Sequence, residues 1–283
     1  MTNIQIHNLH FSYSEDFEVL KGINLNLQNK TTAIVGQNGA GKTTFVKLLK
    51  GLLKPGKGDI LFNGENIANS TVANLSKSIG MVFQNPNDQI FKNKVIQEVM
   101  FGPLNIGQTE QVAWENAIRA LQKVGLENAK NKNPYDMSLS ERKLVTIASI
   151  LAMDTEVIIF DEPTMGQDEA GKQMIKEIIH MLKQQGKLIL CILHDMDFAA
   201  AVFERTIVFN QGNVLLDGAT REVFSNASIL EAAYLEQPYI TQIAKRFGLQ
   251  ETVLTEGELI ERLNEMINVL GSTYNEKGRE ERT

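Results

Sequence analysis

The chain has 283 residues, of which 43% are hydrophobic and 22% charged, a composition typical of a globular protein with one large domain or with a large and a small one. A net charge of -6 argues against a surface that neutralises nucleic-acid phosphates, and the single cysteine, Cys191, excludes an internal disulfide, which fits a reducing cytosol. The opening residues, MTNIQIHNLHF, do not predict a signal peptide, and the longest apolar runs are shorter than the ~20 residues that a membrane-spanning helix needs.

The first eighty residues predict mainly strands, arranged around one glycine-rich loop. Two stretches near the start alternate apolar and polar residues, as the strands of an antiparallel sheet do. A short apolar run then ends in glycine and leads into a segment with helical spacing. In chain order, the expected elements are strands at 4–9, 22–28 and 31–36, a helix at 42–53, a strand and turn at 58–67, and a strand at 78–84.

The rest of the chain alternates helices with apolar strands, which favours a mainly parallel sheet covered on both faces. Two helical stretches between Val95 and about Gly125 interrupt this alternation, so we expect an all-helical insertion there. Beyond Phe224 the pattern is entirely helical, and Thr255 and Glu258 are spaced as a capping box. The remaining expected elements are helices at 95–104, 110–126, 142–152 and 170–186, strands at 156–160 and 187–193, and a hairpin at 205–218.

The strongest motif is GQNGAGKTT, which fits the pattern G-x-x-x-x-G-K-[ST] between a predicted strand and a predicted helix. Backbone N–H groups of such a loop wrap anionic phosphates, and glycines let the backbone approach them closely. Lys42 would contact the β- and γ-phosphates, and Thr43 would bind Mg²⁺. A plain glycine-rich turn would not require Lys-Thr at this spacing. The predicted nucleotide-binding residues are Gly36, Gln37, Asn38, Gly39, Ala40, Gly41, Lys42, Thr43 and Thr44.

Three further polar sites follow apolar strands and should therefore meet at one edge of the sheet. Asp161 ends EVIIFD and is a candidate Mg²⁺ ligand, while Glu162 beside it can accept a proton from an attacking water. His194 follows LILCIL and can donate to a γ-phosphate, although it could equally cap the next helix. Gln84 ends SIGMVFQ and could meet both the metal and the water, or simply be solvated.

Together these motifs resemble those of ATP-binding cassette ATPases, the nucleotide-binding subunits of ABC transporters, over about the first 220 residues. The resemblance implies an α/β P-loop cassette with a mainly parallel core sheet, an antiparallel β subdomain and a helical subdomain. It predicts a cassette at residues 1–224, with its helical subdomain at about 88–155, and a C-terminal helical extension at 225–283. It also implies that Tyr13 stacks on adenine and that Asp168 belongs to the D-loop. The cofactors would be ATP and Mg²⁺.

In this family two cassettes pair head to tail, and each ATP lies between the phosphate loop of one and the signature loop of the other. The usual signature, Leu-Ser-Gly-Gly-Gln, falls here on residues 137–141, MSLSE. Ser138 is kept, so its hydroxyl can still reach a γ-phosphate, but Leu139 adds bulk and Glu141 adds negative charge. Ser138 and Glu141 also fit a helix capping box. We therefore expect an asymmetric pair in which a different cassette supplies the intact signature; a homodimer would carry the weak signature twice.

The stretch VFQNPNDQIF and the helical tail are similar to the ATPase subunits of energy-coupling factor transporters, which take up vitamins and transition-metal ions in prokaryotes. This resemblance implies a peripheral subunit at the cytoplasmic face of the cell membrane, with a transmembrane coupling protein and a substrate-binding membrane protein as partners. Apolar side chains near the insertion would receive a helix of the membrane subunit: Phe91, Met100, Phe101 and Trp114. Three alternatives stay open: another ABC transporter class, a soluble ABC ATPase acting on DNA or ribosomes, and a nucleotide-gated module that no longer hydrolyses ATP.

Overall fold

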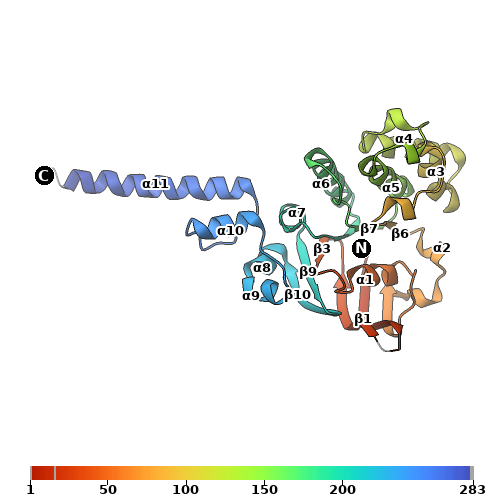
Figure 1. The fold of residues 1–283 in the computed structure, drawn as a ribbon, viewed down its shortest axis with the longest axis horizontal. Helices are drawn as coiled ribbons and strands as arrows, with labels where there is room; N and C mark the ends of the chain where they lie inside the picture. The colour runs from red at the N-terminus through yellow and green to blue at the C-terminus, as the bar shows by residue number, and fades with distance from the viewer. Residues whose placement is uncertain (1, 16, 281–283) are drawn as a thin grey trace.

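The computed structural model describes residues 2–15 and 17–280, which form two sheets, a helical lobe and a helical C-terminal extension (Figure 1). The strands are β1 (Ile4–Ser14), β2 (Phe17–Leu27), β3 (Thr31–Val35), β4 (Lys57–Phe62), β5 (Glu65–Asn66), β6 (Ile79–Val82), β7 (Val157–Asp161), β8 (Leu188–Ile192), β9 (Arg205–Asn210) and β10 (Asn213–Ala219). The helices are α1 (Lys42–Leu49), α2 (Val72–Leu75), α3 (Val95–Asn105), α4 (Glu110–Lys123), α5 (Leu139–Met153), α6 (Glu169–Gln184), α7 (Met196–Val202), α8 (Thr220–Ser225), α9 (Ala227–Ala232), α10 (Tyr239–Arg246) and α11 (Glu256–Glu280).

The central sheet has six strands in the order β10-β9-β3-β8-β7-β6. All its neighbours pair in parallel except β9 and β10, which form the expected hairpin. A second sheet of order β2-β1-β4-β5 is antiparallel throughout. The predicted α/β fold class, with a mainly parallel core and an antiparallel β subdomain, is confirmed.

Each face of the central sheet belongs to a different hydrophobic core, because successive side chains of a strand point to opposite faces. On β3, Ile34 packs with the antiparallel sheet and α1, whereas Ala33 and Val35 pack with the helices of the other face. The strands β3, β7 and β8 are buried along their whole length. This double burial explains why their sequences are continuously apolar rather than alternating.

The helices α3, α4 and α5 form the lobe at one end of the molecule (Figure 1). The capping box predicted at the start of α5 is present: the Ser138 hydroxyl accepts from the Glu141 amide, and the Glu141 carboxylate accepts from the Ser138 amide. Helix α1 is shorter than the expected 42–53. It ends at Leu49 because the chain turns at Gly51, whose φ of 74° lies in the left-handed region that glycine favours.

The C-terminal extension carries α9, α10 and α11 at the opposite end from the α3–α5 lobe, and α11 projects from the body (Figure 1). A small separate core joins Ala244, Val253 and Leu259. The capping box expected at Thr255 is only half formed, because the Glu258 carboxylate accepts from the Leu254 amide and pairs with Arg221 instead. Helices make up most of the tail, and α11 continues to Glu280, through polar residues whose composition favours a frayed end; residues 281–283 lie outside the described part. Among the described residues, no helix combines the length and apolar character needed to cross a membrane.

Candidate nucleotide-binding site

The glycine-rich loop at 36–41 joins the end of β3 to the start of α1, as the motif requires. Gly36 has a φ of 152°, and a Cβ there would lie 2.3 Å from the Phe209 carbonyl oxygen. Gly41 has a φ of 103° and would press a Cβ against Leu20. Glycine is therefore needed at both positions by backbone conformation and by close packing. The loop leads directly into the N-terminus of α1, which favours negative charge.

Lys42 lies across this loop and is buried. Its ammonium donates to the carbonyl oxygens of Gly36 at 2.6 Å and Gln37 at 2.8 Å. Burial lowers the pKa of Lys42, while the carboxylates of Glu162 and Asp161 act in the opposite direction. The lysine is thus held by weakly competing carbonyls at the place where phosphate oxygens would bind it more strongly.

Tyr13 lies at the end of β1 beside the phosphate loop, because its hydroxyl is 3.2 Å from Oγ1 of Thr44. Its ring packs edge to face on Phe11 and is 63% exposed. An aromatic ring that is anchored at both its hydroxyl and its edge, yet keeps an open face, is suited to stacking on a planar base. The structure therefore brings this predicted residue to the loop.

Asp161 ends β7 and is 2% exposed, and its Oδ1 atom is buried without a hydrogen-bond partner. Burial and the nearby Glu162 raise the pKa of Asp161, while a hydrogen bond from the Thr43 hydroxyl and the charge of Lys143 lower it. A buried carboxylate oxygen with no donor is costly unless a ligand satisfies it. With the Thr43 hydroxyl beside it, this oxygen fits a hard cation such as Mg²⁺.

Glu162 and His194 meet across the ends of β7 and β8: Nε2 of His194 lies 3.0 Å from Oε1 of Glu162. Glu162 has a φ of 49°, and its amide donates to the Ile192 carbonyl at 3.1 Å. A non-glycine residue adopts this left-handed conformation at a cost of roughly 1–2 kcal/mol. Such strain persists where surrounding contacts hold it, and here it turns the Glu162 side chain toward His194.

Gln84 follows β6, the edge strand next to β7, and its side chain is exposed. Its amide nitrogen lies 4.0 Å from Sδ of Met165, in the loop after Glu162. Its backbone carbonyl accepts a hydrogen bond from the buried ammonium of Lys143 on α5. The structure thus brings Gln84 close to the acid pair at 161–162.

The loop at the start of α5 is closed on itself. The Ser138 hydroxyl donates to Oε2 of Glu141 at 2.9 Å and accepts from the Glu141 amide at 3.2 Å. These hydrogen bonds from the Ser138 amide and hydroxyl lower the pKa of Glu141, so its carboxylate stays ionised. Leu139 stands outward, 49% exposed. A phosphate approaching this loop would meet an apolar side chain and a negative charge.

The same loop contacts the segment that follows Glu162. The Ser140 hydroxyl donates to Oε1 of Gln167 at 2.9 Å, and the Gln167 amide donates to the Ser140 carbonyl at 3.3 Å. Asp168 is the N-cap of α6, where its side chain accepts from the Gly171 amide at 2.8 Å. The sequence motifs gave no sign of the Ser140–Gln167 pair, because it joins two loops that are far apart in the chain.

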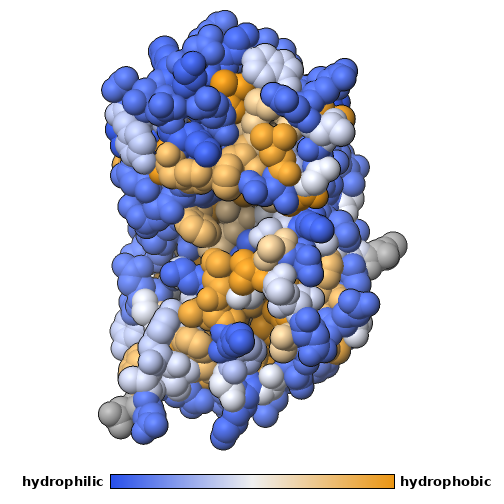
Figure 2. Space-filling model, turned by 90° about the vertical axis from the view of Figure 1, so that its right-hand side faces the viewer, coloured by the Kyte–Doolittle hydropathy of each residue, from blue (hydrophilic) through white to orange (hydrophobic). Residues whose placement is uncertain are grey.

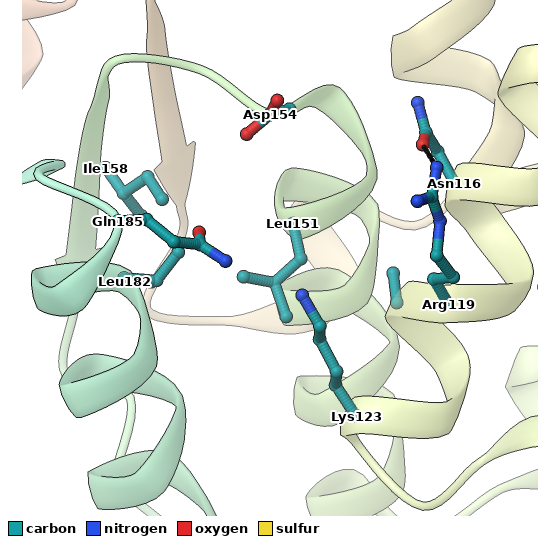
Figure 3. Close-up of a pocket in the computed structure, with 9 residues that line it drawn as sticks. Asn116, Arg119, Lys123, Leu151, Asp154, Ile158, Leu182 and Gln185 are labelled. Carbon is teal, nitrogen blue, oxygen red and sulfur yellow. Dashed lines mark hydrogen bonds between the residues drawn. The ribbon is translucent and has the colours of Figure 1, made fainter.

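A cavity of about 190 Å³ lies elsewhere, between α4, the end of α5 and the end of α6 (Figure 3). The side chains of Arg119 and Lys123 come from α4, and Gln185 follows α6 on the other side. None of its lining residues belongs to the phosphate loop or to the acid pair. It is therefore separate from the candidate site.

A phosphate loop between a strand and a helix, with an acid pair at the end of a nearby strand, defines a P-loop nucleotide-binding ATPase. A family profile described as ABC transporter matches residues 20–165, more than half of the chain. The protein belongs to the ABC transporter family, as one of its ATP-binding subunits, whose ATPase domain binds ATP or ADP and hydrolyses ATP.

Known proteins resemble it over most of its length. A putative ABC transporter ATP-binding protein of Pyrococcus furiosus is 39% identical over 87% of this chain and 94% of its own. The energy-coupling factor transporter ATP-binding protein EcfA of Methanocaldococcus jannaschii is 35% identical over 89% of this chain and 92% of its own. Among solved structures, cbiO1 of Clostridium perfringens, part of the ABC transporter complex cbiONQ, is 34% identical with a TM-score of 0.72, over 86% of this chain and 98% of its own.

Proposed function

We propose that this chain is the ATP-hydrolysing subunit of an energy-coupling factor importer for a vitamin or a transition-metal ion, bound peripherally at the cytoplasmic face of the membrane. The relatives named EcfA and the likeness to cbiO1 support this class of transporter. The contact between Glu162 and His194 beside the phosphate loop carries the hydrolytic part of the proposal. Residues 1–224 would form the cassette and 225–283 the extension.

In the proposed site, ATP phosphates bind the amides of residues 36–44 at the start of α1. The Lys42 ammonium exchanges its bonds to two neutral carbonyls for bonds to charged phosphate oxygens, which add the attraction between opposite charges. Tyr13 stacks on the adenine ring. Thr43, Asp161 and Gln84 are the groups that would hold Mg²⁺, which neutralises charge on the β- and γ-phosphates when bound.

The proposed chemistry is attack of water on the γ-phosphate with Glu162 as the base. Because Oε1 of Glu162 faces Nε2 of His194, the other oxygen, Oε2, is left to orient the water and accept its proton. His194, 39% exposed at its side chain, fixes that carboxylate on one side and reaches solvent on the other. Nε2 carries a single hydrogen, so donation to the γ-phosphate would replace its contact with Glu162.

The proposed pairing is asymmetric. The phosphate loop and the acid pair of this chain have all the expected side chains, whereas its signature loop has lost both glycines. The Ser138 hydroxyl already forms hydrogen bonds with Glu141, so it can bind a phosphate only if the capping box breaks. A second, different cassette with an intact signature would therefore complete the better site over the ATP bound by this chain.

The proposed membrane contact lies at the end of the molecule that carries α2 and α3. Viewed from that end, apolar surface gathers in a hollow across the middle of the molecule (Figure 2). Phe101 on α3 and Phe91 just before it pack edge to face, with ring centres 4.6 Å apart, and stay 39% and 55% exposed. Paired exposed rings suit the apolar face of an amphipathic helix, which we take to be a cytoplasmic helix of the coupling protein.

Co-purification from native membranes tests this proposal. An integral coupling protein, a substrate-binding membrane protein and a second cassette should accompany the chain, and the complex should hydrolyse ATP. Recovery of the chain with ribosomes or DNA, and without membrane proteins, would favour a soluble ABC ATPase instead. Binding of ATP without turnover in any assembly would favour the nucleotide-gated module.

A further inference from the structure

Lys143 is a buried lysine whose place in the molecule the nucleotide site does not require. It lies in the first turn and a half of α5, just after the signature loop, and is 2% exposed. Its ammonium donates to the Phe83 carbonyl at 2.9 Å and to the Gln84 carbonyl. A single side chain of the signature helix therefore holds the backbone on which Gln84 stands.

Burying an ammonium is costly, so this contact is not a neutral way of filling space. Burial lowers the pKa of Lys143 to about 8, although the carboxylates of Asp161 and Glu162 act in the opposite direction. The residues that follow on α5 are mostly apolar and pack in the core without any such cost. Lys143 differs from them by offering donors to two carbonyls that no strand partner satisfies.

The neighbouring residue, Arg142, adds a second tie between the same two segments. Its guanidinium donates to Oδ1 of Asn87 at 2.8 Å, and also to the carbonyls of Met137 and Tyr135. The start of α5 is thus fastened to the segment 83–87 at both its ends. Several hydrogen bonds, from two neighbouring side chains, therefore connect the start of α5 to residues 83–87.

Lys50, at the C-terminus of α1, provides a comparison because its ammonium also reaches the β6 segment. It is also buried, its pKa is also lowered by burial to about 8, and its ammonium donates to Ser76 and to the Ile79 carbonyl at the other end of β6. Lys50 comes from the C-terminus of α1, away from the signature loop. Lys50 therefore holds the start of β6 and does not contact residues 83–87. Of the two lysines, only Lys143 connects residues 83–87 to α5.

We propose that Lys143 is a positioning residue that makes the backbone of Gln84 follow the signature helix α5. The inference rests on the proposed function, in which the signature loop faces the partner's nucleotide and Gln84 faces the nucleotide of this chain. A displacement of α5 by the partner's nucleotide is then passed directly to Gln84. Lys143 couples the two composite sites in this way without contacting either nucleotide.

A double-mutant cycle tests whether Lys143 acts through Gln84. The variants are Lys143→Met, which keeps the length of the side chain without its donors, Gln84→Ala, and the double variant, each assembled with the intact partner cassette. Lys143→Met should lower kcat at least about fivefold with KM for ATP within about twofold, and should add less than about twofold in the Gln84→Ala background. An undiminished effect in that background would overturn the proposal, because Lys143 would then act on Asp161 or Glu162 instead.

Lys50→Met is the matched control, since it removes a buried ammonium that donates to a backbone carbonyl at the other end of β6. It should cost thermal stability about as Lys143→Met does, while kcat changes by less than about twofold. If both variants lower kcat equally, Lys143 only stabilises the fold and the proposal is wrong. Should Lys143→Met fail to fold, Lys143→Gln keeps an uncharged amide donor group, and its kcat should then fall between that of the wild type and that of Gln84→Ala.

Hydrogen exchange on the isolated chain provides a readout that needs no hydrolysis. Lys143→Met should speed exchange of amides in residues 84–90, and Lys50→Met should speed exchange near residues 76–80 instead. Unchanged exchange at 84–90 would show that Lys143 does not hold that segment. If no assembly hydrolyses ATP but these exchange patterns are observed, the proposed function is wrong. The conclusion that Lys143 holds residues 84–90 is then still supported.

Discussion

Nε2 of His194 lies 3.0 Å from Oε1 of Glu162, and this contact closes the gap between the ends of two parallel strands. The Glu162 amide donates to the Ile192 carbonyl, so backbone and side chain hold the same turn. The Glu162 side chain is only 13% exposed. The carboxylate is therefore oriented by the protein itself, which is the condition for a base that needs little reorganisation during the reaction.

Replacing this carboxylate should separate binding from hydrolysis. In the assembled complex, Glu162→Gln should keep ATP affinity within about twofold while turnover falls at least about tenfold, one step of ~1.4 kcal/mol in the barrier. Glu169→Gln, an exposed carboxylate at the start of α6, is the matched control and should leave turnover unchanged. Steady-state ATPase assays and nucleotide titration check both, and unchanged turnover in Glu162→Gln would remove Glu162 from its role.

The parts of the site that the sequence predicts well are those set by local chemistry. The phosphate loop needs glycines and a lysine at fixed spacing, and Asp161 and Glu162 follow a strand that is apolar throughout. The burial of Lys143 is not predicted, because a lysine within the polar start of a helix, SERKLV, is usually exposed. One signal was present: Lys143 is four residues from Ile147 and seven from Ile150, so it shares the face of α5 that they bury.

Removing the buried charge at Asp161 should raise the thermal stability of the metal-free chain and lower the ATPase activity of the complex. Because the pKa of Asp161 is raised in the folded chain, its ionised form opposes folding above the pKa of the unfolded chain. In metal-free buffer at pH 7, Asp161→Asn should therefore raise Tm, by roughly 2–4 °C for each kcal/mol relieved. The gain should shrink as the pH falls, because the wild-type carboxyl becomes protonated at a higher pH in the folded chain than in the unfolded chain.

The same variant should lose metal-dependent turnover in the complex. Asp154→Asn is the control, since that carboxylate is exposed and pairs with Lys187 far from the phosphate loop. Scanning calorimetry at several pH values, with and without Mg²⁺, makes the measurement. A Tm for Asp161→Asn that is lower than wild type at every pH would mean that Asp161 is satisfied by groups of the protein, and that it does not await a cation.

The helical face around α3 should bind the membrane subunit. Phe101→Asp places a charge beside the exposed Phe91 ring and should weaken assembly with the coupling protein at least about tenfold, because it removes an aromatic anchor from the proposed interface. Phe247→Asp introduces the same charge at a more exposed aromatic ring in the C-terminal extension and should leave assembly unchanged. Co-purification yields and crosslinks from an intact complex measure this. Crosslinks confined to residues 225–283 would contradict the assignment.

Periodicity predicts the fold well where the pattern of apolar residues within an element determines which face is buried. It predicts less well where a group distant in the chain competes for the same hydrogen bond. The continuously apolar strands and the capped start of α5 are found where the sequence predicts them. The capping box at Thr255 fails because Arg221, 37 residues before Glu258, draws the Glu258 carboxylate away from the helix end. The short sequence motif around Thr255 does not include Arg221, so the motif alone cannot predict this ion pair.

Restoring the usual signature should cost stability in this chain. The change is Leu139→Gly, Ser140→Gly and Glu141→Gln together. Each glycine weakens the helix start by roughly 0.5–1 kcal/mol, and loss of the Glu141 carboxylate weakens a capping box worth about 1 kcal/mol. Ser140 also gives up its hydroxyl bond to Gln167, worth about 1 kcal/mol. Tm of the nucleotide-free chain should fall, because no new contact compensates these losses.

The same change should activate the site on the partner cassette. Freed from Glu141, the Ser138 hydroxyl and the exposed backbone amides of the loop can bind the γ-phosphate held by the partner, in hydrogen bonds to a charged group worth on the order of 1.5–3 kcal/mol each. These bonds form only when ATP is present, whereas the cost to the helix is the same with and without ATP, so the bonds add to ATP binding. ATP affinity or turnover at the partner's site should therefore rise, and a Lys-to-Ala change in the partner's phosphate loop should abolish the gain. A gain that survives that change would show that the loop does not face the partner's nucleotide, and that Ser138 with Glu141 is only a helix cap.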